Sequence, residues 1–342
     1  MKPILQAGLF ALVLLFPGMG ELSAQSSKPL PKNEGPVPRW EFTQGIQKLV
    51  LKSQFAELEK THEDLLRNGD RFGEGRLKIE FFYEGLDGSE FGEGSEAERQ
   101  LWFAKIEAWK KAFPASPLPL IAEAASWVDY AWAARGSGWA STVTEEGWKK
   151  YRERLSRAES ILLEVKKSAA AGPVPPGWYT VMQHVALGQG WDTDRYDRLF
   201  NEAITAYPRY HAFYFSKAYY LLPRWHGKDG DLEAFAEQVR AGGNAEFYAR
   251  IIWSQYGFYP DRNVFKSPHV RWEFMREGFE EMMKNYPDSE WNLSNYCRFA
   301  CEAGDKATAR RLFVALKGFY WRQVWPSREA YDKYLAWANE GS

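Results

Sequence analysis

Residues 289–317 read SEWNLSNYCRFACEAGDKATARRLFVALK, and this stretch decides the fold of the chain. Two apolar runs of helical spacing flank the pair Gly304-Asp305, and the pair Tyr286-Pro287 precedes the first run. The core positions carry both small and large residues: Leu293, Tyr296, Cys297 and Ala300 in the first run, and Ala309, Phe313 and Leu316 in the second. Glycine ends helices readily and proline cannot continue them, so the stretch predicts two helices joined by a short turn.

This placement of small and large residues resembles a tetratricopeptide repeat. A helix pair of this kind cannot bury its apolar face alone, so it stacks on neighbouring pairs. The resemblance implies an all-α fold, an irregular tetratricopeptide-like array of antiparallel helical hairpins that forms an α-α superhelix. The array is irregular because aromatic-proline pairs recur at Pro114, Pro208 and Pro287, and their separations are not multiples of the repeat length of about 34 residues.

Helical patterns also fill most of the remaining chain. Ser95 and Glu98 form a capping box, and we expect the helix that follows to turn Leu101, Trp102, Ile106 and Trp109 toward the core. Thr144 caps another helix. One segment, residues 77–83, is compatible with an extended conformation. Further helices are expected near residues 210–222, 231–241, 245–256, 269–286 and 327–339.

The N-terminal part of the chain has the pattern of a secretory signal peptide over residues 1–24. Lys2 precedes an apolar run over residues 9–16, which ends well short of the roughly 20 residues of a membrane span. We therefore expect export to the periplasm or the cell exterior. Prolines in residues 25–39 predict a disordered tether, and residues 40–342 are expected to form a single helical domain that begins near Trp40.

Charge and cysteine content exclude several classes of function. The chain has 44 Lys and Arg against 45 Asp and Glu, so it offers no electrostatic reason to propose a nucleic-acid or anionic-membrane partner. Cys297 and Cys301 are four residues apart on one predicted helix, where their roughly parallel side chains favour core packing over a disulfide. Five scattered histidines give no zinc-binding pattern. We expect no metal, no cofactor and no catalytic residue.

Two further blocks of sequence carry a family resemblance. Residues 134–140 read ARGSGWA and residues 142–148 read TVTEEGW; farther on, residues 188–192 read GQGWD and residues 219–227 read YYLLPRWHG. Together they resemble the bacterial domain of unknown function 4034 family over roughly residues 55–252. His226 departs from the pattern, which has a second Gly there. The resemblance implies a tetratricopeptide-like helical fold and implies no activity.

Six positions in these blocks are candidates for a ligand site or for a purely structural signature: Arg135, Trp139, Trp191, Arg224, Trp225 and His226. Glycines near Arg135 would let a ligand approach the backbone, and its guanidinium group could bind a carboxylate or phosphate. The alternative is a helix end at Gly136, with a buried Arg135 clamping a neighbouring helix. Trp127 and most other aromatic residues are attributed to packing.

The sequence favours a non-catalytic scaffold that binds a protein or peptide in a groove lined by Arg, Tyr and Asn. The alternative is a protein that binds or hydrolyses carbohydrate with aromatic platforms and paired carboxylates. That alternative predicts a pocket with two acids beside Trp139 or Trp225. The sequence does not indicate the oligomeric state.

Overall fold

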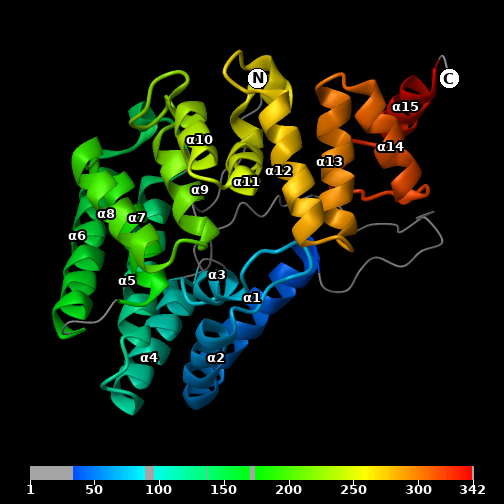
Figure 1. The fold of residues 1–342 in the computed structure, drawn as a ribbon. Helices are drawn as coiled ribbons and strands as arrows, with labels where there is room; N and C mark the ends of the chain where they lie inside the picture. Colours follow the sequence, from blue (N-terminus) through cyan, green and yellow to red (C-terminus); the bar gives the residue numbers. More distant parts are fainter. Residues whose placement is uncertain (1–33, 89–95, 137, 170–173, 341–342) are drawn as a thin grey trace. The chain divides into compact units, whose positions relative to one another are not determined.

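The computed structural model describes residues 34–88, 96–136, 138–169 and 174–340, and within these ranges the chain is all-α (Figure 1). Fifteen α-helices and four short 3-10 helices account for the regular structure there, which confirms the predicted fold class. No helix among the described residues is long and apolar enough to cross a membrane. The predicted signal peptide and residues 25–33 of the predicted tether lie outside the described residues.

The described residues divide into two compact units. Unit 1 contains Arg39–Asp70 and Leu77–Lys217, and unit 2 contains residues 34–38, Arg71–Arg76 and the chain from Ala218 onward. Each unit is described by itself below. Whether the two together make the single domain expected from the sequence stays a prediction.

In unit 1, consecutive helices pack on one another from α4 to α8, and Figure 1 shows α5, α6, α7 and α8 side by side. The elements of this unit are α1 (Pro36–Leu51), α2 (Phe55–Asn68), α3 (Lys78–Glu84), α4 (Glu96–Ala112), α5 (Leu118–Arg135), η2 (Ala140–Thr142), α6 (Glu145–Ser168), α7 (Pro176–Gln189), α8 (Thr193–Ala206) and α9 (His211–Tyr220), of which α1 and α9 extend into unit 2.

Local signals in the sequence explain the ends and faces of these helices. The Thr144 side chain accepts a hydrogen bond of 3.0 Å from the backbone N–H of Gly147, so it caps α6 as predicted. Helix α4 buries Trp102, Ile106 and Trp109. Leu101, expected to face the core with them, is instead 51% exposed, because it is one residue from Trp102 and thus about 100° away around the helix.

The segment expected to be extended is helical. Only Leu77 has extended backbone angles, with φ −70° and ψ 129°, and α3 begins at Lys78. Ile79, Phe82 and Tyr83 are buried within the unit. A short apolar run cannot by its periodicity distinguish a strand from a buried helix, and here the helix forms.

In unit 2, the predicted hairpin forms as two helices joined by a short turn. Ser289 and Asp305 cap its helices through side-chain hydrogen bonds to Asn292 N–H and Thr308 N–H. Cys297 and Cys301 are buried free thiols in its first helix. The tetratricopeptide assignment itself stays a prediction. The elements are α10 (Asp231–Ala241), α11 (Ala245–Ser254), η3 (Tyr256–Phe258), η4 (Pro260–Arg262), η5 (Val264–Lys266), α12 (Trp272–Asn285), α13 (Glu290–Glu302), α14 (Lys306–Leu316) and α15 (Arg328–Asn339).

The first described residues are anchored at the N-terminus of α13. The Glu34 carboxylate is 3% exposed and accepts hydrogen bonds from Ser289 Oγ at 2.5 Å and from the backbone N–H of Glu290 at 3.0 Å. A carboxylate is favoured there because a helix N-terminus carries unpaired N–H groups and a partial positive charge. Helix α1 then begins at Pro36. Regular structure therefore starts four residues before Trp40, the residue near which the sequence predicts the helical domain to begin.

Candidate functional site

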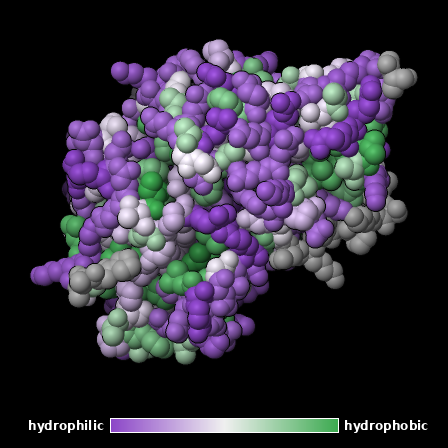
Figure 2. Space-filling view, viewed as in Figure 1, coloured by the Kyte–Doolittle hydropathy of each residue, from purple (hydrophilic) through white to green (hydrophobic). Residues whose placement is uncertain are grey.

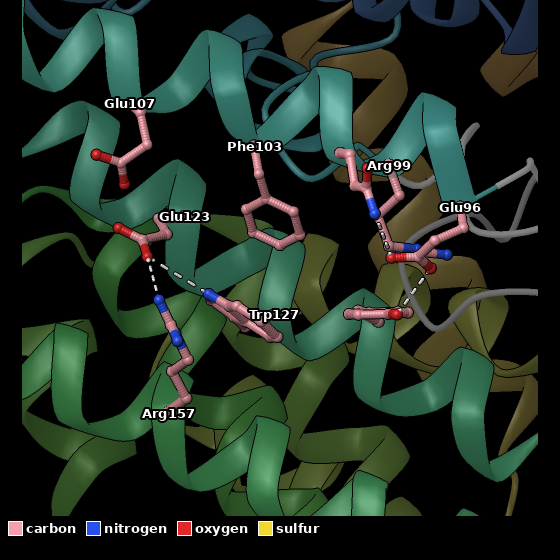
Figure 3. Close-up of a pocket in the computed structure, with 9 residues that line it drawn as sticks. Glu96, Arg99, Phe103, Glu107, Glu123, Trp127 and Arg157 are labelled. Carbon is pink, nitrogen blue, oxygen red and sulfur yellow. Dashed lines mark hydrogen bonds and ion pairs between the residues drawn. The ribbon is translucent and has the colours of Figure 1, made fainter.

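Helices α4, α5 and α6 of unit 1 form a pocket of about 340 Å³ (Figure 3). This volume lies at the lower end of the range for small-ligand sites. The pocket combines aromatic rings, carboxylates and guanidinium groups. Its lining consists of Glu96, Arg99, Gln100, Phe103 and Glu107 from α4, Glu123, Trp127 and Tyr130 from α5, and Arg157 from α6.

Helical periodicity brings these side chains to one surface. The lining residues of α4 recur at intervals of three or four, as do those of α5, so each set occupies one face of its helix. Trp102, Ile106 and Trp109 occupy another face of α4, which packs in the core. Helix α4 therefore has two functional faces, an apolar one for the fold and a mixed polar and aromatic one for the pocket.

The centre of the pocket is aromatic. The ring centroids of Phe103 and Trp127 are 4.8 Å apart and their planes are tilted by 36°. Figure 3 shows Phe103 projecting from α4 toward Trp127 on α5. The guanidinium carbon of Arg157 lies 4.3 Å from the ring centroid of Trp127. Apolar contact and a cation–π contact thus meet on one indole ring.

At one end of the pocket, Glu123 is surrounded by donors. Its side chain is 7% exposed, and Lys110 Nζ lies 2.7 Å from Oε2. Trp127 Nε1 donates to Oε1 at 3.4 Å, and Arg157 Nη2 lies 3.5 Å from the same oxygen (Figure 3). Lys110 also pairs with Glu107. Burial lowers the pKa of Lys110, but its bonds to the two glutamates outweigh burial and leave that pKa raised.

At the other end, the ring of Tyr130 is flanked by two cations. The guanidinium carbons of Arg99 and Arg154 lie 4.0 and 3.2 Å from its centroid, and its hydroxyl donates to Glu96 Oε2 at 2.9 Å. Arg99 Nη1 also lies 3.5 Å from Oδ2 of Asp129 beneath the pocket. Burial raises the pKa of Asp129 to about 6, although Arg99 acts against this shift.

This arrangement offers contacts for binding. The nine lining residues, all within the described ranges, include no cysteine, serine, threonine, lysine or histidine, and so no pair of a nucleophile and a neighbouring histidine base. In the described part of the chain, no group of three or more His, Cys, Asp or Glu side chains could hold a metal ion. The pocket instead presents flat apolar surfaces between charged ends.

None of the six positions singled out from the sequence lines this pocket. Arg135 ends α5, and its Nη1 donates to the carbonyl oxygens of Gly136 at 3.0 Å and Gly138 at 3.3 Å. Its guanidinium carbon lies 5.7 Å from the ring centroid of Trp148 on α6. Gly136 ends α5, as the structural alternative expected, but Arg135 is partly exposed and not buried. Trp139, in the same loop, is 82% exposed.

Trp191 takes part in a network that joins three helices of unit 1. Its Nε1 donates to Gln189 Oε1 at 2.8 Å, and the guanidinium carbon of Arg195 lies 3.2 Å from its ring centroid. Gln189 and Arg195 both donate to Glu159 on α6, at 2.8 and 3.0 Å. These contacts give Trp191 a packing role where α6, α7 and α8 meet.

The remaining three positions lie in the turn that follows α9, in unit 2. The ring centroid of Trp225 is 5.7 Å from that of Tyr219, and the guanidinium carbon of Arg224 lies 5.6 Å from the Trp225 centroid. His226 stacks on Tyr220 with a centroid distance of 4.5 Å. A ligand role for these residues, and for the three in unit 1, stays a prediction.

No motif in the sequence singles out the pocket residues, and the spacing of Trp127 predicts packing. A signal for them exists in α4, where polar and aromatic residues recur at helical spacing beside the buried stripe. This pattern indicates a second face on α4, but it does not show that α5 and α6 pack against that face.

Comparison with known proteins gives one match. Residues 43–157 match the model of a family described as "Domain of unknown function (DUF4034)", and no curated protein and no solved structure matches the chain. The matched range includes the first of the two sequence blocks, at residues 134–148; resemblance beyond residue 157 and a bacterial origin stay predictions. All nine lining residues also fall in it, so the pocket lies in the part of the chain that is similar to this family.

Proposed function

We propose that this chain is an exported, non-catalytic binding protein whose α4–α5–α6 pocket takes a short segment of a protein or peptide. The observation that carries the proposal is the aromatic pair Phe103 and Trp127 at the centre of the pocket, with charged side chains at both ends. Protein interfaces have the same composition, since a few aromatic residues dominate binding and charged residues surround them.

The dimensions of the pocket support an extended ligand. Glu96 and Glu107 lie at the two ends of the lining face of α4, and the helical rise of about 1.5 Å per residue separates them by about 16 Å. An extended chain advances about 3.3 Å per residue, so about five residues span this distance. The groove expected from the sequence was to contain Arg, Tyr and Asn; this pocket contains Arg and Tyr but no Asn, and its other lining residues are Glu, Gln, Phe and Trp.

A carbohydrate ligand is the second candidate, because Glu107 and Glu123 share the pocket with Trp127. Lys110 pairs with both glutamates, so neither is a free carboxylate for acid–base catalysis on a sugar. Stacking of a sugar on Trp127 would require Arg157 to leave that ring, and a sugar brings no positive charge to replace it. The pocket therefore fits a peptide better than a sugar. The two acids also lie beside Trp127 and not beside Trp139 or Trp225, where the carbohydrate alternative placed them.

The test is a direct binding screen with the purified full chain on an array of random short peptides and, in parallel, on a glycan array. The pocket variant is Phe103→Ala. Its matched control is Phe274→Ala, since Phe274 is also half-buried, with Arg240 3.8 Å from its ring, but belongs to unit 2. We expect peptides that bind the wild type and the control, and at least tenfold weaker binding by Phe103→Ala.

Failure of every peptide to bind would contradict the proposal. Equal binding by Phe103→Ala and Phe274→Ala would place the site elsewhere and contradict it as well. Glycans that bind the wild type and lose affinity with Phe103→Ala, in the absence of bound peptides, would establish the carbohydrate candidate instead.

A further inference from the structure

One side chain of the protein already occupies the aromatic centre of the pocket. Arg157 extends from α6 with 58% of its side chain exposed, and its guanidinium carbon lies 4.3 Å from the Trp127 ring centroid. Its Nη2 lies 3.5 Å from Oε1 of Glu123. Arg157 thus makes two contacts typical of a bound arginine side chain, one with an aromatic ring and one with a carboxylate.

Arg157 can give up these two contacts at a small cost in free energy. The distance of 3.5 Å between Arg157 and Glu123 is at the long limit for a hydrogen bond, whereas Lys110 pairs with the same carboxylate at 2.7 Å. If Arg157 moves away, Glu123 keeps Lys110 as its partner and is not left as an isolated buried charge. The exposed side chain of Arg157 would return to water.

The charge of the pocket favours a cation in its place. Three carboxylates line the pocket, those of Glu96, Glu107 and Glu123, against the guanidinium groups of Arg99 and Arg157. Arg99 pairs with buried Asp129 beneath the pocket. Lys110 and Arg154 are the neighbouring cations, on Glu107 and Glu123 and on the ring of Tyr130. Displacement of Arg157 would therefore leave three lining carboxylates against these two cations, and one unbalanced negative charge beside an aromatic surface suits a guanidinium group.

We infer that the pocket binds an arginine side chain of the partner peptide, and that Arg157 occupies this place in the free protein as an intramolecular competitor. The inference rests on the proposed function and names the chemistry of its ligand. Incoming arginine would stack on Trp127 and Phe103 and pair with Glu123 and Glu107. Binding requires the pocket to be vacated first, so Arg157 lowers the apparent affinity for the ligand.

Removal of the competing side chain of Arg157 should raise the affinity for an arginine peptide, and by a modest factor. An exposed ion pair and an exposed cation–π contact each change an equilibrium constant by less than about tenfold. Removal of Arg157 should therefore strengthen the binding of an arginine peptide by about threefold to tenfold. A ligand with a carboxylate at this position would lose its partner instead, and its binding would weaken.

The experiment measures dissociation constants by fluorescence anisotropy for peptides of about five residues with arginine, citrulline or glutamate at the centre. Citrulline has nearly the shape of arginine without its charge. The full-length proteins are the wild type, Arg157→Ala, Arg157→Gln and the control Arg240→Ala. Arg240 is a matched control because it also lies over an aromatic ring, that of Phe274, and pairs with Glu277, but in unit 2.

We expect the arginine peptide to bind at least tenfold tighter than the citrulline peptide. Both Arg157 variants should bind it more tightly than the wild type does, and Arg240→Ala should not differ from the wild type. If peptides bind but the glutamate peptide is preferred, or if the Arg157 variants bind the arginine peptide no better than the wild type, the inference is wrong and the proposed function stands.

If no peptide binds any of these proteins, the proposed function fails together with the inference. A last arm uses N-acetyl-arginine amide in place of the peptides. Binding as tight as that of the arginine peptide would show that a small arginine derivative suffices, and would contradict the assignment to a partner peptide.

Discussion

Replacement of Asp129 by asparagine should change how the stability of unit 1 depends on pH. Burial raises the pKa of this carboxyl from 3.8 to about 6. Between these values the folded state holds more protons than the unfolded state, so the free energy of unfolding falls as pH rises. The contribution is fully present below about pH 4 and lost above about pH 6. A shift of about two units corresponds to about 3 kcal/mol.

The assay is a series of urea titrations between about pH 4 and pH 7 on the wild type and Asp129→Asn, followed by circular dichroism and by hydrogen exchange of the α5 amides. Subtraction cancels the titration of every other group common to both proteins. Loss of the partner of Arg99 adds an offset that is constant with pH, because arginine stays charged throughout. We expect the variant to gain about 3 kcal/mol relative to the wild type from pH 4 to pH 7. A difference that does not vary with pH would refute the assigned burial cost.

Three further changes test the packing. Burial lowers the pKa of His184 from 6.5 to about 4, so its contribution to stability is present above pH 6.5 and lost as pH falls toward 4. The wild type therefore loses about 3 kcal/mol of unfolding free energy from this group on acidification, and His184→Gln should not show that loss in the same titrations. Gly177→Ala would place its Cβ 2.2 Å from Cδ1 of Tyr83 and should cost about 2 kcal/mol or more, whereas Gly45→Ala, with nothing within 4 Å, should stabilise the protein by about 0.5–1 kcal/mol, as urea midpoints will report. Asp305→Ala removes the N-cap of α14 and should cost about 1–2 kcal/mol, seen as a lower melting temperature.

Much of the helical architecture could be predicted because its signals are local. Thr144, Ser289 and Asp305 lie at helix starts, and each accepts a hydrogen bond from the backbone N–H three residues later, which requires no knowledge of the rest of the chain. The sequence-based predictions were wrong where they rested on hydrophobic periodicity alone. Leu101 was assigned to the core although it is one residue away from the buried stripe, and the run that contains Phe82 was too short to distinguish a helix from a strand.

The pocket could not be predicted because it depends on how three helices meet. Phe103 and Trp127 are 24 positions apart, and Arg157 comes from a third helix; their meeting depends on the rotation of each helix about its axis, which no local pattern encodes. Trp127 also lies at helical spacing from the apolar residues of α5, so its position in the sequence looks like that of a core residue. The sequence-based candidates, among them Arg135, instead drew attention through glycine-rich turns, which mark helix ends as readily as ligand sites.

The anchoring of Glu34 at α13 has a consequence for how the chain folds. Glu34 and Ser289 are 255 residues apart, and unit 2 takes residues from three separate parts of the sequence. A ribosome makes the first of these parts long before the helix that receives it, so Glu34 can form its bonds to Ser289 and Glu290 only after α13 has been made. Any continuous fragment that contains all of one unit also contains residues of the other, and a truncation before α13 would remove the hydrogen-bond donors of Glu34.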